Sequence, residues 1–277
     1  MAQVMSLASM VFMAAPILAP AMGQLVLSVA SWRWIFAVLA AIGLATWVWV
    51  MFRLPETLGP ENRTAISLPA AVASARTVAT DRMSLGYGCA MAVVSCGLFG
   101  FLMSVQPIFQ HTFERPELLP SGFAIMAGGM AAASLVNAAI VRRYGMRRIG
   151  HAALFFFTGV AGIHLIVALS GHESLATFIG LQMTMMIGFS LMAGNFGAMA
   201  MENMGAVAGM ASSLQGSLSS LAAAVIGAII GRSFDGTTVP LYAGYLTCGV
   251  VALIIVYVTE RGQFFVAHHA PPALAGD

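Results

Sequence analysis

The stretch APILAPAMGQ, from Ala15 to Gln24, places two prolines four residues apart inside a long apolar run. Each proline removes a backbone donor and crowds the carbonyl four residues earlier, so both weaken an ordinary helix. Pro16, Pro20 and Gly23 stand at positions i, i+4 and i+7 and therefore share one helix face. We interpret that face as a close contact with a neighbouring membrane helix. The alternative is that the prolines are merely tolerated, as membrane helices allow when neighbours satisfy the freed carbonyls.

The composition outside this stretch indicates a membrane protein. Of the 277 residues 60% are hydrophobic and 8% are charged, whereas a soluble domain carries about 25% charged residues. A bilayer-crossing helix needs about 20 apolar residues, and the segments between charges predict an all-α, polytopic bundle with eight transmembrane helices. They run over residues 4–29, 33–53, 85–109, 121–141, 149–169, 175–200, 207–230 and 240–259.

The basic residues predict the orientation. All twelve are arginines, and they fall unevenly between the two sets of loops. Because basic residues concentrate on the cytoplasmic side, the richer set and the even number of spans predict that both termini face the cytoplasm. That set contains Arg53, Arg63, Arg76, Arg82, Arg142, Arg143, Arg147, Arg148 and Arg261, against Arg33, Arg115 and Arg232 in the other.

The order of spans and loops predicts four regions. Residues 1–53 hold two spans, and residues 54–84 form a cytoplasmic linker that opens with the Pro-, Gly- and charge-rich LPETLGPENR. Residues 85–260 hold six spans, and residues 261–277 read as a disordered tail. The three cysteines and six histidines are scattered without metal-ligand spacing, and no catalytic constellation or cofactor motif occurs. We therefore expect no enzyme activity, no metal, no cofactor and no nucleic-acid partner.

This layout resembles the major facilitator superfamily, whose members join two six-span halves by a long cytoplasmic loop. The run MVFMAAPILAPAMGQLVL followed by SWRWIF is similar to the fifth span, and the turn into the sixth, of drug:proton antiporters of the bicyclomycin-resistance (Bcr/CflA) type. Gln24 stands where that type has a second glycine. NAAIVRRYGMRR, residues 137–148, resembles the loop between spans eight and nine, and AGMASSLQGSLSS, residues 208–220, resembles the start of span eleven.

The resemblance implies that the chain corresponds to spans five to twelve and lacks a four-span N-terminal segment. It also implies efflux of lipophilic, multidrug-type substrates in exchange for protons, although no acid lies in the middle of a span here. One alternative is a non-transporting membrane fragment or split-gene subunit that complements the missing segment. Another is an uptake carrier for small solutes in the same superfamily.

The resemblance also implies three groups of site residues. The interface between the two halves would contain Pro16, Pro20, Gly23, Gln24, Gly227 and Gly231, although Gly227 and Gly231 also fit plain helix packing. The substrate cavity would contain Phe99, Phe101, Gln106, Asn195 and Gln215, with contacts between helices as the alternative role. A cytoplasmic gate would contain Asn137, Arg142, Arg143, Arg147 and Arg148, with a positive-inside anchor as the alternative.

Overall fold

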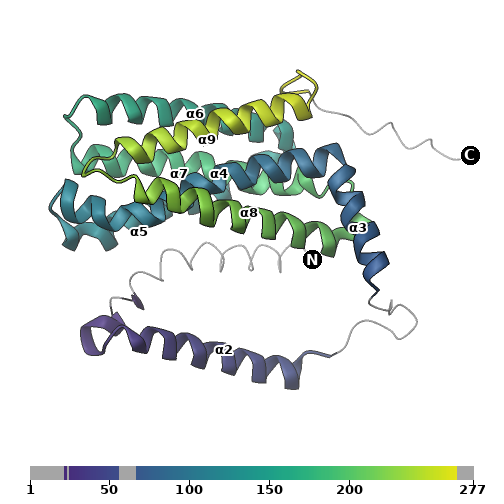
Figure 1. Ribbon diagram of the computed structural model, residues 1–277, viewed down its shortest axis with the longest axis horizontal. Helices are drawn as coiled ribbons and strands as arrows, with labels where there is room; N and C mark the ends of the chain where they lie inside the picture. Colours follow the sequence, from purple (N-terminus) through teal and green to yellow (C-terminus); the bar gives the residue numbers. More distant parts are fainter. Residues whose placement is uncertain (1–21, 24, 56–66, 267–277) are drawn as a thin grey trace, which may run out of the picture. The chain divides into compact units, whose positions relative to one another are not determined.

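The computed structural model of the chain describes residues 22–23, 25–55 and 67–266 (Figure 1). Every regular element in these ranges is helical, which confirms the predicted all-α class for the described part of the chain. The α-helices are α2 (Arg33–Arg53), α3 (Leu68–Thr80), α4 (Arg82–Pro107), α5 (Leu119–Tyr144), α6 (Met146–Leu169), α7 (Leu175–Ala200), α8 (Ala208–Arg232) and α9 (Val239–Thr259). Short elements are the π-helix η2 (Ile108–Thr112) and the 3₁₀ turns η3 (Pro116–Leu118) and η4 (Gly205–Val207).

Seven helices in the described ranges are long and apolar enough to cross a bilayer. They coincide with seven of the eight predicted spans, and the predicted limits differ from theirs by a few residues. The remaining predicted span, 4–29, lies largely outside the described residues. The predicted division into residues 1–53, 54–84, 85–260 and 261–277 stays a prediction.

Local chemistry explains where several helices begin. The Asp81 carboxylate caps α4 by accepting a 2.7 Å hydrogen bond from the Ser84 amide, and the Ser174 hydroxyl caps α7 by accepting from the Thr177 amide. Gly145 alone separates α5 from α6, with φ of 80°. That left-handed conformation favours glycine, so one residue suffices to reverse the chain.

The chain divides into two compact units between Ala71 and Val72. In the first unit, no residue of α2 is buried, as expected of a helix whose solvent is lipid. Tryptophans lie near both of its ends, at Trp32 and Trp34 and at Trp47 and Trp49. Aromatic rings prefer the two membrane interfaces, so α2 has the length and the anchors of a membrane span.

The second unit is a six-helix bundle in which α4 packs against α7, α8 and α9, while α7 also packs against α5 and α6. Glycines of α4 allow this close approach. A Cβ atom on Gly97 would lie 2.5 Å from Cδ1 of Tyr245, and one on Gly100 would lie 2.7 Å from Cγ2 of Ile230. Gly86 and Gly88 of α4 likewise leave room for Thr259 and Gln215. The three cysteines are free thiols.

Candidate substrate cavity

A cavity of about 290 Å³ lies between α4, α7 and α8, near the end of the bundle where α4 and α8 begin. Tyr87 and Met91 of α4, Phe196 of α7, and Ser212 and Gln215 of α8 contribute to its wall. None of the described residues that line it is charged. An apolar cavity with a few neutral polar groups is the usual form of a site for an organic molecule.

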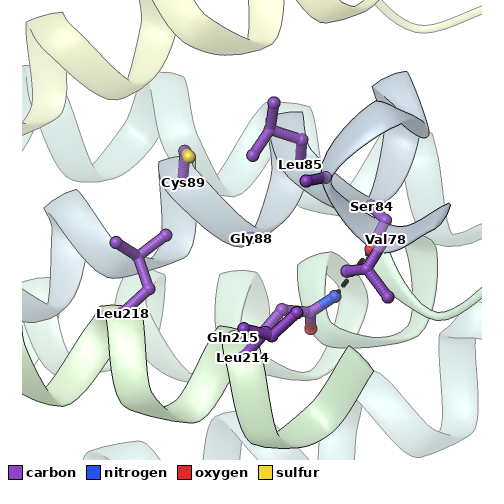
Figure 2. Close-up of a pocket in the computed structure, with 9 residues that line it drawn as sticks. Val78, Ser84, Leu85, Gly88, Cys89, Leu214, Gln215 and Leu218 are labelled. Carbon is purple, nitrogen blue, oxygen red and sulfur yellow. Dashed lines mark hydrogen bonds between the residues drawn. The ribbon is translucent and has the colours of Figure 1, made fainter. Parts of the chain in front are cut away.

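A smaller pocket of about 200 Å³ adjoins this cavity, between α3, α4 and α8 (Figure 2). Gln215 lines both pockets, and Figure 2 shows its amide nitrogen directed toward Ser84. Nε2 of Gln215 donates to Oγ of Ser84 at 2.9 Å and to the carbonyl of Ala200 at 3.3 Å. Gly88 makes room for the amide, since its Cβ position is 3.2 Å from Cγ of Gln215.

Tyr87 connects the cavity wall to a buried polar cluster. Its hydroxyl donates to Oε1 of Glu260 at 2.5 Å and lies 2.8 Å from Nε2 of His151. The amide of Phe265 donates to Nδ1 of His151 at 3.0 Å. These contacts are all satisfied when His151 is neutral and carries its proton on Nε2, which then donates to the tyrosine oxygen.

Arg147 completes this cluster by joining the ends of three helices. Its Nε donates to Oε1 of Glu260 at 3.1 Å, and its terminal nitrogen donates to Oε2 of Glu202 at 3.0 Å. The Glu260 side chain is 1% exposed and that of Arg147 is 10% exposed. Burial raises the pKa of Glu260, but hydrogen bonds from Tyr87 and Arg147 and the charge of Arg147 outweigh it and lower the pKa overall.

A second buried network lies at the opposite end of the bundle. Nε2 of His164 lies 2.5 Å from Oε1 of Glu173, and the Thr238 hydroxyl donates to the same carboxylate. The His164 ring stacks on Tyr242, with ring centroids 3.4 Å apart. The Tyr242 hydroxyl then donates to Gln182, whose amide donates to Tyr245 at 3.1 Å. This network ties α6, α7 and α9 together.

Comparison with known proteins identifies the family. The model of the Major Facilitator Superfamily matches residues 1–228. The chain belongs to the Major Facilitator Superfamily.

Two curated relatives agree with this assignment. The chain is 28% identical over 255 residues to the uncharacterized MFS-type transporter YdgK of Bacillus subtilis, covering 89% of this chain and 61% of the relative. It is 28% identical over 263 residues to the bicyclomycin resistance protein homolog of Haemophilus influenzae, covering 93% of this chain and 65% of the relative. The chain thus spans less than two thirds of the length of both relatives. The helices and the family together make it an integral membrane protein with a partial major-facilitator bundle.

The five residues predicted to line the substrate cavity occupy different environments. Gln215 lines the cavity. Phe101 is buried and stacks on Phe123 of α5, and Asn195 is buried and donates to Asn137 at 2.8 Å. The contacts of Phe101 and Asn195 join neighbouring helices, which is the alternative role considered for these residues. Phe99 is partly exposed beside Gly227, and Gln106 is exposed. A role for any of them in substrate binding stays a prediction.

The expected interface residues are described only in part. Pro16, Pro20 and Gln24 lie outside the described residues, whereas Gly23 is helical. Gly227 and Gly231 face α4 of their own unit: their Cβ positions would lie 2.7 Å from Cβ of Phe99 and 2.6 Å from Cβ of Met103. Both glycines therefore support close packing of α8 on α4. Their role between the two halves of a superfamily protein stays a prediction.

Two of the expected gate residues contact other helices of the bundle, and the other three are exposed. Arg147 binds Glu202 and Glu260, two carboxylates of its own six-helix unit. Arg142, Arg143 and Arg148 are exposed. Asn137 accepts from Asn195, so it fastens α5 to α7. Gating itself stays a prediction.

The sequence alone did not predict the two buried polar networks, and no functional role was assigned to their tyrosines, to His164 or to their glutamates. One signal was available: Arg147 begins one span, while Glu202 and Glu260 follow the ends of two others. In an alternating bundle these three positions lie at the same membrane face, so their opposite charges predict a pair.

Proposed function

We propose that this chain forms the substrate-binding part of a membrane exporter for lipophilic small molecules. The observation that carries the proposal is the uncharged wall of the cavity between α4, α7 and α8. Met91 is partly exposed and offers polarizable, apolar surface, and the Gln215 amide offers one neutral polar contact. The bicyclomycin resistance protein homolog among the relatives supports a role in drug efflux, and with it the Bcr/CflA assignment.

We further propose that export is coupled to protons. The support is the position of Glu260, a buried carboxylate that Tyr87 links to the cavity wall. Buried ionisable groups in transporters commonly serve as proton carriers. While Arg147 is bound, the carboxylate stays ionised. A conformer in which Arg147 moves away would let Glu260 take up a proton, so protonation and cavity opening would be coupled. In this proposal the arginine-rich end of the bundle faces the cytoplasm of a bacterial inner membrane.

Two other functions are distinguishable from this one. A carrier that takes up polar solutes needs charged or hydroxyl-rich walls, and the hydroxyls here are few: Tyr87, Ser212 and Ser219. A non-transporting fragment, or a subunit that works with a separate four-span segment, would keep the cavity but move no substrate by itself.

The first experiment measures binding to the full chain in lipid nanodiscs. The neutral dye N-phenylnaphthylamine should bind saturably above the signal of empty discs. Gly216 lines the cavity, and no atom lies within 4 Å of its Cβ position. Gly216→Phe fills this space and should weaken binding about tenfold. Gly159→Phe on α6, which also has open space around its Cβ position, is the matched control.

The second experiment measures transport in an efflux-deficient bacterium. Lower dye accumulation that a protonophore restores would support proton-driven export by the chain alone. Dye binding without any change in accumulation would support the subunit or fragment. Unchanged binding by Gly216→Phe would overturn the cavity assignment.

A further inference from the structure

A further hollow, separate from the two pockets described above, lies beside the tight turn between α5 and α6. Only Gly145 separates the two helices, yet α5 packs mainly against α7, α6 packs against α7 and α9, and α5 and α6 make little contact with one another. They therefore diverge from the turn while α7 closes the space behind them. The result is a groove of about 560 Å³ that opens toward the surroundings of the bundle.

The walls of this groove are apolar along its length. Ile140 of α5, Phe156 of α6, and Ile187 and Leu191 of α7 contribute to them. Phe156 is 45% exposed, so the groove lies at the surface and is not a closed interior cavity. Around a membrane helix bundle such a surface faces acyl chains, because seven helices of the described chain have the length and hydropathy of spans.

One end of the groove carries positive charge. Tyr144 and Arg148 line that end, and the guanidinium carbon of Arg143 lies 5.5 Å from the centre of the Tyr144 ring. Arg142, Arg143 and Arg148 are exposed, and within residues 22–23, 25–55 and 67–266 no carboxylate forms a salt bridge with them. Arg147, between them in sequence, is already paired with Glu202 and Glu260.

We propose that this groove is a binding site for an anionic phospholipid. An acyl chain would lie along Ile140, Phe156 and Leu191, and the phosphate would meet the guanidinium groups of Arg148 and Arg143. Guanidinium groups bind phosphate through two parallel hydrogen bonds, and an aromatic ring such as that of Tyr144 suits the headgroup level. The site binds lipid in its own right and does not depend on the transport activity proposed above.

Charge complementarity distinguishes this site from general contact with the bilayer. A zwitterionic lipid offers the same acyl chains, but its headgroup has no net charge. Basic clusters between membrane helices favour anionic headgroups. The groove should therefore select phosphatidylglycerol over phosphatidylcholine of the same chain length.

The test uses the purified, delipidated full chain in mild detergent. Each protein is titrated with phosphatidylglycerol, with phosphatidylcholine or with inorganic phosphate, and its Tm is compared with its own lipid-free value. Phosphatidylglycerol should raise Tm saturably, while phosphatidylcholine and inorganic phosphate should not. Mass spectrometry of co-purified lipid provides a second measurement that does not depend on protein stability.

Three variants locate the site. Arg148→Gln should weaken the apparent affinity for phosphatidylglycerol about fivefold, and Ala152→Trp should block the groove from an exposed wall position. Arg82→Gln is the matched control, because it removes the same charge from an exposed position at the start of α4, outside the groove. Equal responses to the two lipids, a response to phosphate alone, or wild-type lipid retention by Arg148→Gln would overturn the proposal.

Discussion

Nε of Arg147 donates to Oε1 of Glu260 at 3.1 Å, and the carboxylate side chain is 1% exposed. The pair joins the start of α6 to the end of α9, across 113 residues of sequence. A second bond from Arg147 reaches Glu202 just after α7, and Tyr87 brings α4 into the same cluster. Arg147 therefore joins the ends of α6, α7 and α9 directly, and Tyr87 attaches α4 to the cluster through Glu260.

Arg147→Gln should strongly destabilise the six-helix bundle. It removes the cation beside a buried carboxylate, a change that costs about 3–5 kcal/mol in the free energy of unfolding. Glu202→Gln is the matched comparison, because it removes the charge of the second carboxylate that Arg147 binds. Because the Glu202 side chain is 38% exposed, its loss should cost about 1 kcal/mol or less. Unfolding titrations in detergent measure the free energy of unfolding of both variants. Equal losses would contradict the assignment of Glu260 as the dominant partner of Arg147.

The pH dependence of stability follows from the lowered pKa of Glu260. Its ordinary value is 4.5. The folded state binds this proton less readily than the unfolded state, so the stabilisation is fully present above about pH 4.5 and is lost as pH falls through the lower folded pKa. Glu260→Gln should lower Tm at neutral pH and reduce its fall between pH 5 and pH 3. If wild type and variant lose stability in parallel over that interval, Glu260 is not responsible.

Gln182 should prove essential to the opposite end of the bundle. Gln182→Leu removes the acceptor of Tyr242 and the donor to Tyr245, both fully buried residues. A buried hydroxyl without a partner costs about 1–3 kcal/mol. Adding Tyr242→Phe and Tyr245→Phe removes both hydroxyls and should recover most of the lost free energy of unfolding. A triple variant that is less stable than Gln182→Leu would show that the tyrosines act through other contacts.

Gly227 should tolerate no side chain, because α4 approaches it closely. A Cβ atom there would lie 2.7 Å from Cβ of Phe99 and 3.1 Å from the backbone nitrogen of Gly100. Gly227→Ala should therefore cost about 1–3 kcal/mol by forcing the helices apart. Gly159→Ala on α6 meets no atom within 4 Å and should be neutral or stabilising by about 0.5–1 kcal/mol. Similar Tm values for both variants would contradict the packing at Gly227.

The candidate site was less predictable than the spans. Of the five expected cavity residues, Gln215 lines the cavity, whereas Phe101 and Asn195 are buried in contacts between helices. Residue type did not separate these cases, because an amide or a ring suits a cavity wall and a helix contact equally well. The direction of each side chain depends on how its helix is rotated against its neighbours.

The sequence by itself determined the class of protein and, to within a few residues, the limits of the seven described helices that could span a membrane. Long apolar segments bounded by charge are a local property, since a lipid solvent requires each helix to satisfy its own backbone. Only the tertiary structure decided what Arg147, Glu260, Tyr87 and Gln182 do. Their partners lie on other helices, and burial makes those pairings necessary because an unpaired polar group in the bundle is costly.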